Sequence, residues 1–417
     1  MTAPVRLLVV GAGDRGTRYA RFAQQSGRAR VVAVAEADPA RRASFAEEFG
    51  IAPALVFDDW ARLEGAGERV ADAAIVATQD SLHAGPAVLL AGRGYHLLLE
   101  KPMAPDEPSA TRIADAVLRA GVIAAVCHVL RYTPYTTLLK RLLDEGRIGR
   151  LVSVQHLEPV GWWHQAHSFV RGNWRRAADS SPMLLAKSCH DVDWLLYLAG
   201  RPVRRVSSFG GLAHFRAEER PPGAASRCLD CSLEPGCAYS APRLYLGEIA
   251  GRAPTDPAPW PVSVLTRHAD PAAVVEALRT GPYGRCVYDC DNDVVDHQVV
   301  SMELADGATI SFTMTAFTPA EQRKTRLFGT HGYIDGDGAR VRLVDFRTGE
   351  DTTTDVAASP SADHSDGDAA LVDAFVSAVA TGDPAWLRSD VTTSLDGHRV
   401  VWAAEEARRT GTVVSLP

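Results

Sequence analysis

The sequence lacks a long hydrophobic run, an excess of positive charge and an even cysteine framework. No apolar stretch approaches the roughly 20 residues that a membrane-spanning helix needs, and Met1–Val10 is too short a start for a signal peptide. The net charge is −7, whereas a general nucleic-acid binder needs clustered positive charge. The 7 cysteines are an odd number, which in a reducing compartment favours metal ligands or free thiols over disulfides. We therefore expect a cytoplasmic protein without nucleic-acid or membrane partners.

The chain of 417 residues is longer than one hydrophobic core usually supports, so we expect two domains. Over residues 1–127, short β-branched runs such as Val5–Val10 alternate with amphipathic stretches, which predicts a parallel sheet with helices on both faces. Over residues 128–417, runs such as Val299–Leu304 indicate an α+β domain with a mostly antiparallel sheet. The stretch around 214–270 is rich in Cys, Pro and Gly, and we interpret it as an insertion in the second domain.

A glycine-rich fingerprint follows the first predicted strand and opens the first predicted helix. This context gives the G-x-G-x-x-G pattern its meaning as a dinucleotide-binding turn, although a purely structural glycine turn is the alternative. Gly11 makes the tight turn, Gly13 lets the backbone approach the pyrophosphate, and Gly16 permits close packing of helix on strand. The helix N-terminus adds N–H donors for the phosphates. The residues predicted to bind the cofactor here are Gly11, Ala12, Gly13, Asp14, Arg15 and Gly16. The expected first domain is thus a Rossmann domain.

An acidic residue ends the second predicted strand, roughly twenty residues after the fingerprint, where such a residue usually holds the adenosine ribose. Glu36 occupies this position, and its carboxylate would accept hydrogen bonds from the 2′-hydroxyl and repel a 2′-phosphate. Asp38 competes for the role, while Arg41 and Arg42 lie close enough in sequence to meet a 2′-phosphate. We therefore predict NAD as the cofactor, with NADP as the less favoured alternative.

Further motifs are less generic than the glycine loop. Glu100-Lys101-Pro102 closes the fourth predicted strand, and Ala77-Thr78-Gln79-Asp80-Ser81-Leu82-His83 fits an A-T-x-x-x-x-H turn after the third. The turn Asp144–Gly149 and the run His190-Asp191-Val192-Asp193 lie farther along the chain. With this combination the sequence resembles the glucose–fructose oxidoreductase, inositol dehydrogenase and MocA (Gfo/Idh/MocA) family over most of its length, except in the cysteine-rich insertion.

The resemblance implies that the nicotinamide ring lies between the Rossmann fold and the face of the second domain's sheet. It implies that Thr78, Gln79 and His83 lie beside the cofactor, with Glu100 and Lys101 at its ring. It is also compatible with a cis Lys101–Pro102 peptide, which X–Pro bonds permit at modest cost. Because the family is commonly oligomeric, we expect a homo-oligomer, either a dimer or a tetramer.

Oxidation of an alcohol needs a base for the hydroxyl proton while hydride leaves the same carbon. His190 is the predicted base, from its position in the family motif and from the near-neutral pKa of imidazole, although a helix-capping role is the alternative. Lys101 is predicted to hydrogen-bond the substrate oxygen and to stabilise a developing alkoxide. Its position before a proline, at the end of a parallel strand, directs it into the crevice where such sheets bind ligands.

The sequence departs from the family pattern four residues before His190. Many members carry an aspartate there, whereas this chain has Ala186 followed by Lys187. Either Asp191 substitutes for the missing carboxylate, or Lys187 is a second cation in the pocket that acts as a base. A pocket with two lysines would also suit a carboxylated substrate such as a uronate.

Two parts of the chain supply candidate substrate contacts. One directly follows the fifth predicted strand, at a position that faces the cleft in the family. The other is the segment Trp162–Arg175, which is dense in aromatic, imidazole and guanidinium groups. Sugars are bound by aromatic faces and bidentate polar groups, which fits this composition. Packing of these side chains against the sheet is the alternative. The candidates are Arg131, Tyr132, His164, His167, Arg171, Trp174 and Asp191.

The cysteine spacing Cys228-x2-Cys231-x5-Cys237 suits a soft metal, with Cys290 as the fourth ligand or Cys286 in its place. We predict a structural zinc that would staple the loop-rich insertion, with an iron–sulfur cluster less favoured. Unligated thiols are the alternative.

Together these features predict an NAD(P)-dependent oxidoreductase that transfers a hydride between nicotinamide and a hydroxyl-bearing carbon of a sugar, polyol or glycoside. Two alternatives remain at this point. One is redox-neutral glycoside cleavage through transient oxidation by bound NAD, and the other is a non-catalytic, dinucleotide-bound sensor. The presence of both Lys101 and His190 argues against the sensor.

Overall fold

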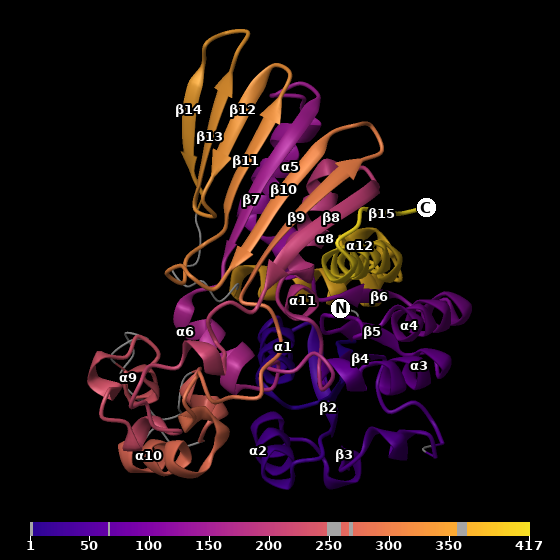
Figure 1. The fold of residues 1–417 in the computed structure, drawn as a ribbon. Coiled ribbons are helices and arrows are strands. Elements are labelled where there is room, and N and C mark those ends of the chain that lie inside the picture. The colour runs from indigo at the N-terminus through magenta and orange to yellow at the C-terminus, as the bar shows by residue number, and fades with distance from the viewer. Residues whose placement is uncertain (1–2, 66, 248–259, 267–269, 357–364) are drawn as a thin grey trace.

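The structure is a computed structural model that describes residues 3–65, 67–247, 260–266, 270–356 and 365–417. A tall second sheet rises from a layered Rossmann unit, and a loop-rich lobe lies beside that unit (Figure 1). This arrangement confirms the predicted fold class. Among the described helices, none combines the length and the apolar character that a membrane span requires.

The first sheet has six parallel strands in the order β3-β2-β1-β4-β5-β6. Its strands are β1 (Val5–Val10), β2 (Ala29–Ala35), β3 (Val56–Phe57), β4 (Ala73–Val76), β5 (His96–Leu99) and β6 (Ala124–Val126), and its helices are α1 (Asp14–Gln25), α2 (Pro39–Phe49), α3 (Ala84–Gly92) and α4 (Glu107–Ala120). In β1, Leu8 and Val10 enter one core while Leu7 and Val9 enter the other, so both faces are covered. The strand order reverses between β1 and β4, which is where such sheets bind ligands.

The second sheet has nine strands in the order β14-β13-β12-β11-β7-β10-β9-β8-β15. They are β7 (Leu151–Pro159), β8 (Val203–Gly211), β9 (His297–Leu304), β10 (Thr309–Thr315), β11 (Lys324–Gly329), β12 (Gly332–Gly336), β13 (Arg340–Asp345), β14 (Asp351–Asp355) and β15 (Val414–Ser415). Only the β7–β10 pair is parallel among the described pairings. The sheet is therefore mostly antiparallel, as predicted.

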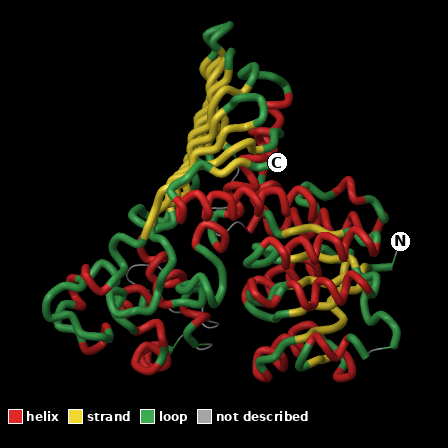
Figure 2. Tube along the Cα trace, turned by 45° about the vertical axis from the view of Figure 1, so that its right-hand side comes forward, coloured by secondary structure: helices red, strands yellow, loops and turns green. Residues whose placement is uncertain are grey.

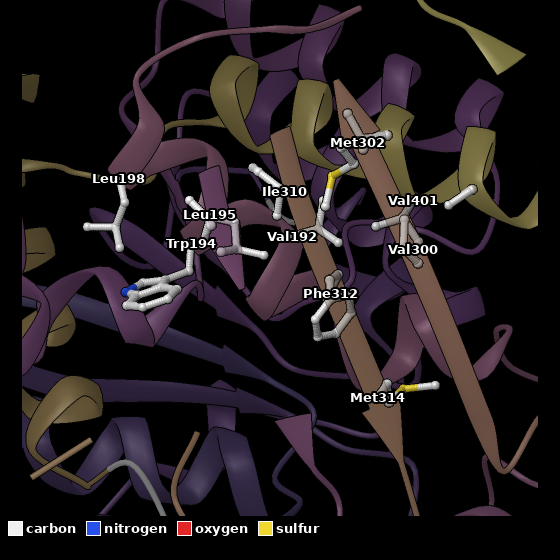
Figure 3. Packing of buried hydrophobic residues seen from close by; sticks show 14 of the residues in the cluster. Val192, Trp194, Leu195, Leu198, Val300, Met302, Ile310, Phe312, Met314 and Val401 are labelled. Atoms are coloured by element: carbon white, nitrogen blue, oxygen red, sulfur yellow. The ribbon is translucent and has the colours of Figure 1, made fainter. Parts of the chain in front are cut away.

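Helices cover one face of the second sheet and leave the other bare (Figure 2). The covering helices are α5 (Pro134–Asp144), α7 (Met183–Ala186), α8 (Cys189–Ala199) and α12 (Val391–Thr410). Figure 3 shows how side chains of β9, β10, α8 and α12 meet in this core, with Val300, Met302, Ile310, Phe312, Met314, Val192, Trp194, Leu195, Leu198 and Val401 labelled. Strand alternation explains the bare face, because the residues between the buried ones point away from the helices.

The two C-terminal helices connect both cores. In α11 (Ser365–Thr381), Leu371 and Phe375 pack into a Rossmann core although they lie far beyond residue 127. In α12, Leu395 packs into a Rossmann core and Val401 packs into the core under the second sheet. The chain end therefore ties the second sheet to the nucleotide-binding unit.

The loop-rich lobe contains α9 (Ala241–Tyr245) and α10 (Pro271–Thr280) and has a small core of its own. It stands beside the Rossmann unit in both views (Figures 1 and 2). The predicted insertion around 214–270 falls largely in this lobe, although its parts 248–259 and 267–269 lie outside the described residues. The lobe lies between β8 and β9 in the chain, and it also packs against α6 (Trp162–His164) and a π-helical stretch, Gln165–Arg171.

A buried ion pair should hold α11 on the Rossmann unit. Arg15 donates from Nη1 to Asp368 Oδ2 at 2.9 Å, and the Asp368 side chain is fully buried. We expect Asp368→Asn to lower the free energy of unfolding by about 1.5–3 kcal/mol, because Arg15 loses its charge-assisted hydrogen bonds to a fully buried carboxylate and keeps only its ion pair with Glu100. Urea unfolding measures this. The control is Asp373→Asn on the same helix, whose pair with Arg28 is exposed and should be worth at most about 1 kcal/mol. Equal losses would contradict the account.

Candidate active site

The glycine loop at the end of β1 has the steric properties of a dinucleotide turn. Gly11 has φ +90°, and a Cβ there would lie 2.5 Å from the Ala77 carbonyl oxygen. A Cβ on Gly16 would lie 2.0 Å from the Gly11 carbonyl oxygen. In contrast, a Cβ on Gly13 would meet nothing closer than Arg41 Nη1 at 3.9 Å. Two glycines are thus required by packing, and the third keeps the space before the α1 N-terminus open for a phosphate.

Glu36 lies directly against this loop. Its Oε2 accepts from the Ala12 N–H at 2.8 Å, and its Oε1 accepts from the Asp38 N–H at 2.9 Å. Arg42 is engaged with the backbone, since its Nη1 donates to the carbonyl oxygen of Glu36 at 2.6 Å. Arg41 reaches Asp38 at 3.8 Å. The carboxylate therefore lies at the end of β2 beside the glycine loop.

The turn after β4 lies beside the glycine loop and contains a polar atom without a hydrogen-bond partner. The Thr78 hydroxyl is buried without a hydrogen-bond partner, which a bound cofactor would supply. His83 plays a different part, because its Nδ1 lies 2.8 Å from the Pro102 carbonyl oxygen and its Nε2 lies 3.1 Å from the Thr78 carbonyl oxygen. It joins the turn of Thr78 and Gln79 to the turn after β5. The open loop and the orphaned hydroxyl fit a dinucleotide.

Arg15 and Glu100, both predicted to contact the cofactor, pair with each other. Arg15 Nε donates to Glu100 Oε1 at 2.9 Å, and its other nitrogens reach Asp368 and the Tyr19 hydroxyl. The second Glu100 oxygen accepts from the Lys101 N–H. In this arrangement both side chains support the start of α1 and the turn that carries Lys101.

Lys101 extends from the Rossmann unit to the second domain. Its Nζ donates to the Ala186 carbonyl oxygen at 2.8 Å, at the end of α7. The Lys101–Pro102 peptide is cis. His190 follows in the first turn of α8, and its ring stands edge-on to the buried His128 at 5.8 Å. The structure thus brings Lys101 to the turn that leads directly into the helix of His190.

A compensated charge network lies next to this turn. Lys187 Nζ is 3.1 Å from Glu158 Oε1, and Arg323 Nε is 3.0 Å from Glu158 Oε2. Arg323 also pairs with Asp191, and His156 Nε2 lies 3.2 Å from Asp191 Oδ1. Burial opposes ionisation of Asp191, but the Arg323 charge and the His156 hydrogen bond hold its pKa below the usual value. Lys187 is therefore ion-paired in the network, and Asp191 is fully buried in it, so neither is a free group at a substrate.

Arg131 and Tyr132, both predicted to contact the substrate, have their polar atoms engaged within the protein. Arg131 is buried and bidentate to Asp193, with Nε–Oδ2 at 2.8 Å and Nη2–Oδ1 at 2.6 Å. The Tyr132 hydroxyl lies 3.0 Å from Ser389 Oγ. Both side chains use their polar atoms to join the turn after β6 to α8 and to the start of α12.

Arg171 and His167, also predicted to contact the substrate, have polar atoms engaged with residues of the lobe. Arg171 is only 1% exposed and donates to the Arg285 and Tyr239 carbonyl oxygens at 2.8 and 2.7 Å. His167 Nδ1 lies 2.8 Å from the Tyr245 hydroxyl. The π-helical stretch is buried throughout, so these polar side chains must find partners in the lobe.

Trp174 is bound to the turn after β4, and His164 lies close enough to Lys187 for that charge to act on it. Trp174 is 38% exposed, and its Nε1 donates to Asp80 Oδ1 at 3.4 Å. Asp80 also accepts from Ser181 Oγ at 2.8 Å, which fastens the second domain to the turn beside Gln79. Burial, then the charge of Lys187, lowers the pKa of His164 well below its usual value. Asp80 stood at an unspecified position of the A-T-x-x-x-x-H turn, and Glu158 and Arg323 had no sequence signal, because their partners are remote in the chain.

The predicted zinc site is not supported. All seven cysteines are free thiols, and among the described residues no group of three or more His, Cys, Asp or Glu could hold a metal ion. Arg171 Nη2 lies 3.5 Å from Cys228 Sγ, and Cys290 Sγ donates to the Cys286 carbonyl oxygen at 3.2 Å. The remaining predicted ligands, Cys231 and Cys237, are half-buried thiols. A guanidinium and backbone carbonyls, together with aromatic packing, hold the lobe.

Two family models match nearly the whole chain. They describe the NAD-binding Rossmann fold of an oxidoreductase family over residues 5–128 and the C-terminal alpha/beta domain of that family over residues 140–416. The chain belongs to the Gfo/Idh/MocA oxidoreductase family. This confirms the resemblance stated from the motifs.

The relatives in this family include different activities. Inositol 2-dehydrogenase of Streptomyces avermitilis is 32% identical over 212 residues, 50% of this chain and 57% of that protein. The 2,7-anhydro-N-acetylneuraminate hydratase of Escherichia coli is 27% identical over 251 residues, 57% of this chain and 63% of that protein. The matched stretches thus span less than two thirds of these curated relatives.

Solved structures of the Gfo/Idh/MocA fold superpose over the full chain. Levoglucosan dehydrogenase in complex with NADH and L-sorbose gives a TM-score of 0.71 at 18% identity, covering 100% of this chain and 99% of that one. An oxidoreductase from Agrobacterium radiobacter in complex with NAD+, L-tartaric acid and magnesium gives 0.72 at 14% identity, covering 99% and 98%. At these identities the likeness shows the fold.

The buried histidines predict acid sensitivity of the folded state. Burial lowers the pKa of His167 and of His398 to about 3. An unfolded histidine titrates near 6.5, so below that pH the unfolded chain binds protons that the folded chain does not. We expect the free energy of unfolding to fall as pH drops from about 6.5 towards 3, by about 1.4 kcal/mol per pH unit and histidine. Urea unfolding at several pH values measures this slope. His167→Gln should reduce it, and a slope unchanged by that substitution would contradict the assignment.

Proposed function

We propose that the chain is an NAD-dependent oxidoreductase that moves a hydride between nicotinamide and a hydroxyl-bearing carbon of a sugar, polyol or glycoside. One observation carries the proposal: Lys101 Nζ, from the carboxyl end of β5, reaches the Ala186 carbonyl oxygen just before the helix of His190. This geometry supports one site, at the junction of the two domains, that the Lys101 ammonium and the His190 imidazole share. The inositol 2-dehydrogenase relative supports the substrate class.

The mechanism assigns separate tasks to the two side chains. Lys101 exchanges its carbonyl acceptor for the substrate oxygen and stabilises the negative charge that develops there. His190 accepts the hydroxyl proton, a task for which an imidazole near neutrality is suited. NAD, when bound, supplies the hydride acceptor. The glycine loop, Glu36 and Thr78 would hold it, while Arg15 and Glu100 fix the turn that aims Lys101.

Local charge supports NAD over NADP. The Glu36 carboxylate lies at the loop, and an open hollow next to it is lined by Ala37, Asp58, Asp59, Ala61 and Arg62. Carboxylates in this region would repel a 2′-phosphate. Arg42 donates to the backbone carbonyls of Glu36 and Ala37, and Arg41, which lies beside the glycine loop, is 4.0 Å from Glu36 Oε1 and 3.8 Å from Asp38 Oδ2.

The function is tested with a panel of sugars, polyols and glycosides in parallel NAD and NADP assays. We expect reduced nicotinamide to accumulate with NAD and much less with NADP. Lys101→Met should lower kcat by about 100- to 1000-fold, because one charge-stabilising donor at the reacting oxygen is lost. NAD affinity, measured by calorimetry, should stay within a few fold. Lys140→Met, which removes an ion pair with the exposed Asp144 and a contact 6.0 Å from the centroid of the Tyr197 ring, is the control and should keep full activity.

Other outcomes of this assay separate the alternatives. Product without net reduced nicotinamide would support redox-neutral chemistry, which the hydratase relative favours and which would suit a site with Ala186 in place of a carboxylate. No product and no spectral change across the panel would support a sensor.

We further propose that a second copy of the chain covers the bare face of the second sheet. Phe209 and Val299 pair across β8 and β9 on this face and are 67% and 38% exposed. Apolar side chains on an uncovered sheet favour association. Sedimentation velocity should find a dimer or tetramer that Phe209→Glu with Val299→Glu dissociates, while Trp386→Glu, at an exposed indole elsewhere, does not. A wild-type monomer at micromolar concentration would contradict this.

A further inference from the structure

The insertion lobe contributes one indole to the segment that borders the candidate site. Trp260 is half-buried, and its ring centroid lies 5.3 Å from that of His164, edge-on, and 5.4 Å from that of Trp163. A third ring, His167, also stands edge-on to it at 5.3 Å. Trp260 thus packs on the stretch that follows β7 and precedes α7.

The same stretch also reaches the turn predicted to lie beside the cofactor. The Phe169 ring lies 6.0 Å from that of His164 and 6.3 Å from that of Trp174, whose Nε1 donates to Asp80 Oδ1 in the turn beside Gln79. His164 therefore has the lobe indole on one side and, through Phe169 and Trp174, this turn on the other. The influence of Lys187 and Lys101 on the pKa of His164, after that of burial, agrees with this placement.

The candidate site has an outer part at Trp260 and an inner part at Lys101, and the two parts differ in chemistry. Trp260 and Trp163 form an aromatic surface in the outer part, and the charge of Lys187 is neutralised by Glu158 at 3.1 Å. The inner part holds Lys101, whose ammonium donates to a backbone carbonyl that a substrate oxygen can replace. Indole faces bind the apolar face of a sugar ring or an aryl group, whereas a hydroxyl needs the ammonium.

We propose that Trp260 forms the outer wall of the substrate site and selects glycosides that carry a second ring over monosaccharides. The ring to be oxidised occupies the inner part at Lys101, and the second sugar or aglycone stacks on the indole. The inference rests on the proposed function, and it assigns the insertion lobe a role in specificity. Because Lys187 and Glu158 compensate each other, the preferred glycoside is neutral rather than a uronate.

The test compares binding of glucose, cellobiose and para-nitrophenyl glucoside to the NAD-loaded protein by calorimetry and saturation-transfer NMR. In Trp260→Ala, affinity for the two-ring ligands should fall about tenfold, since one aromatic stacking contact is lost, while affinity for glucose changes less than twofold. Trp260→Phe should recover most of the affinity. Trp386→Ala removes an exposed indole outside the lobe and should change neither ligand class.

Three results would overturn the proposal. They are equal losses for one-ring and two-ring ligands in Trp260→Ala, no loss for either, and a wild-type protein that binds neither class. Equal losses together with a lowered melting temperature would make Trp260 a staple of the lobe. Because these readouts are binding constants, they are independent of turnover, so failure to form reduced nicotinamide would count against the proposed function alone.

Discussion

The hydrogen bond from Lys101 Nζ to the Ala186 carbonyl oxygen is the contact on which the site depends. It joins the carboxyl end of β5 in the parallel sheet to the end of α7 under the antiparallel sheet. A single ammonium held by a neutral acceptor is a good donor for a substrate oxygen, because exchanging one neutral acceptor for another breaks no ion pair. If the two sheets were displaced by even one helical turn, the lysine and His190 would not serve the same substrate atom.

Two buried charge networks hold this contact in place, one on each side. Arg15, Glu100 and Asp368 fix the turn that begins with Lys101. Glu158, Lys187 and Arg323 fix the turn that precedes His190. Buried ion pairs contribute little net stability, but removing one partner is costly, so such networks define geometry more than they stabilise the fold. The cations in both networks are compensated, which leaves Lys101 as the cation paired to a carbonyl at the junction.

The local parts of the site were predictable from sequence, and the long-range parts were not. The glycine loop, Glu36 and the Glu-Lys-Pro turn follow from residue types that a short stretch of chain requires. Arg131 was predicted as a substrate contact from its position in the family, and Arg171 because guanidinium groups suit sugars, yet their partners lie 62 and 114 residues away. Nothing in a single sequence indicates such pairings. The cysteine spacing, which suggested zinc, likewise gave no indication that the buried Arg171 guanidinium lies 3.5 Å from Cys228 Sγ. Asp80 stood inside a recognised motif, but its serine partners lie about a hundred positions away.

The most direct measurement is a crystal structure of the protein with NAD and a slowly reacting polyol. We expect Lys101 Nζ to leave the Ala186 carbonyl for the substrate oxygen, and a ring nitrogen of His190 to lie within hydrogen-bond distance of that oxygen. A complex in which the polyol binds elsewhere, with Lys101 still on the Ala186 carbonyl and His190 distant from the nicotinamide, would contradict it.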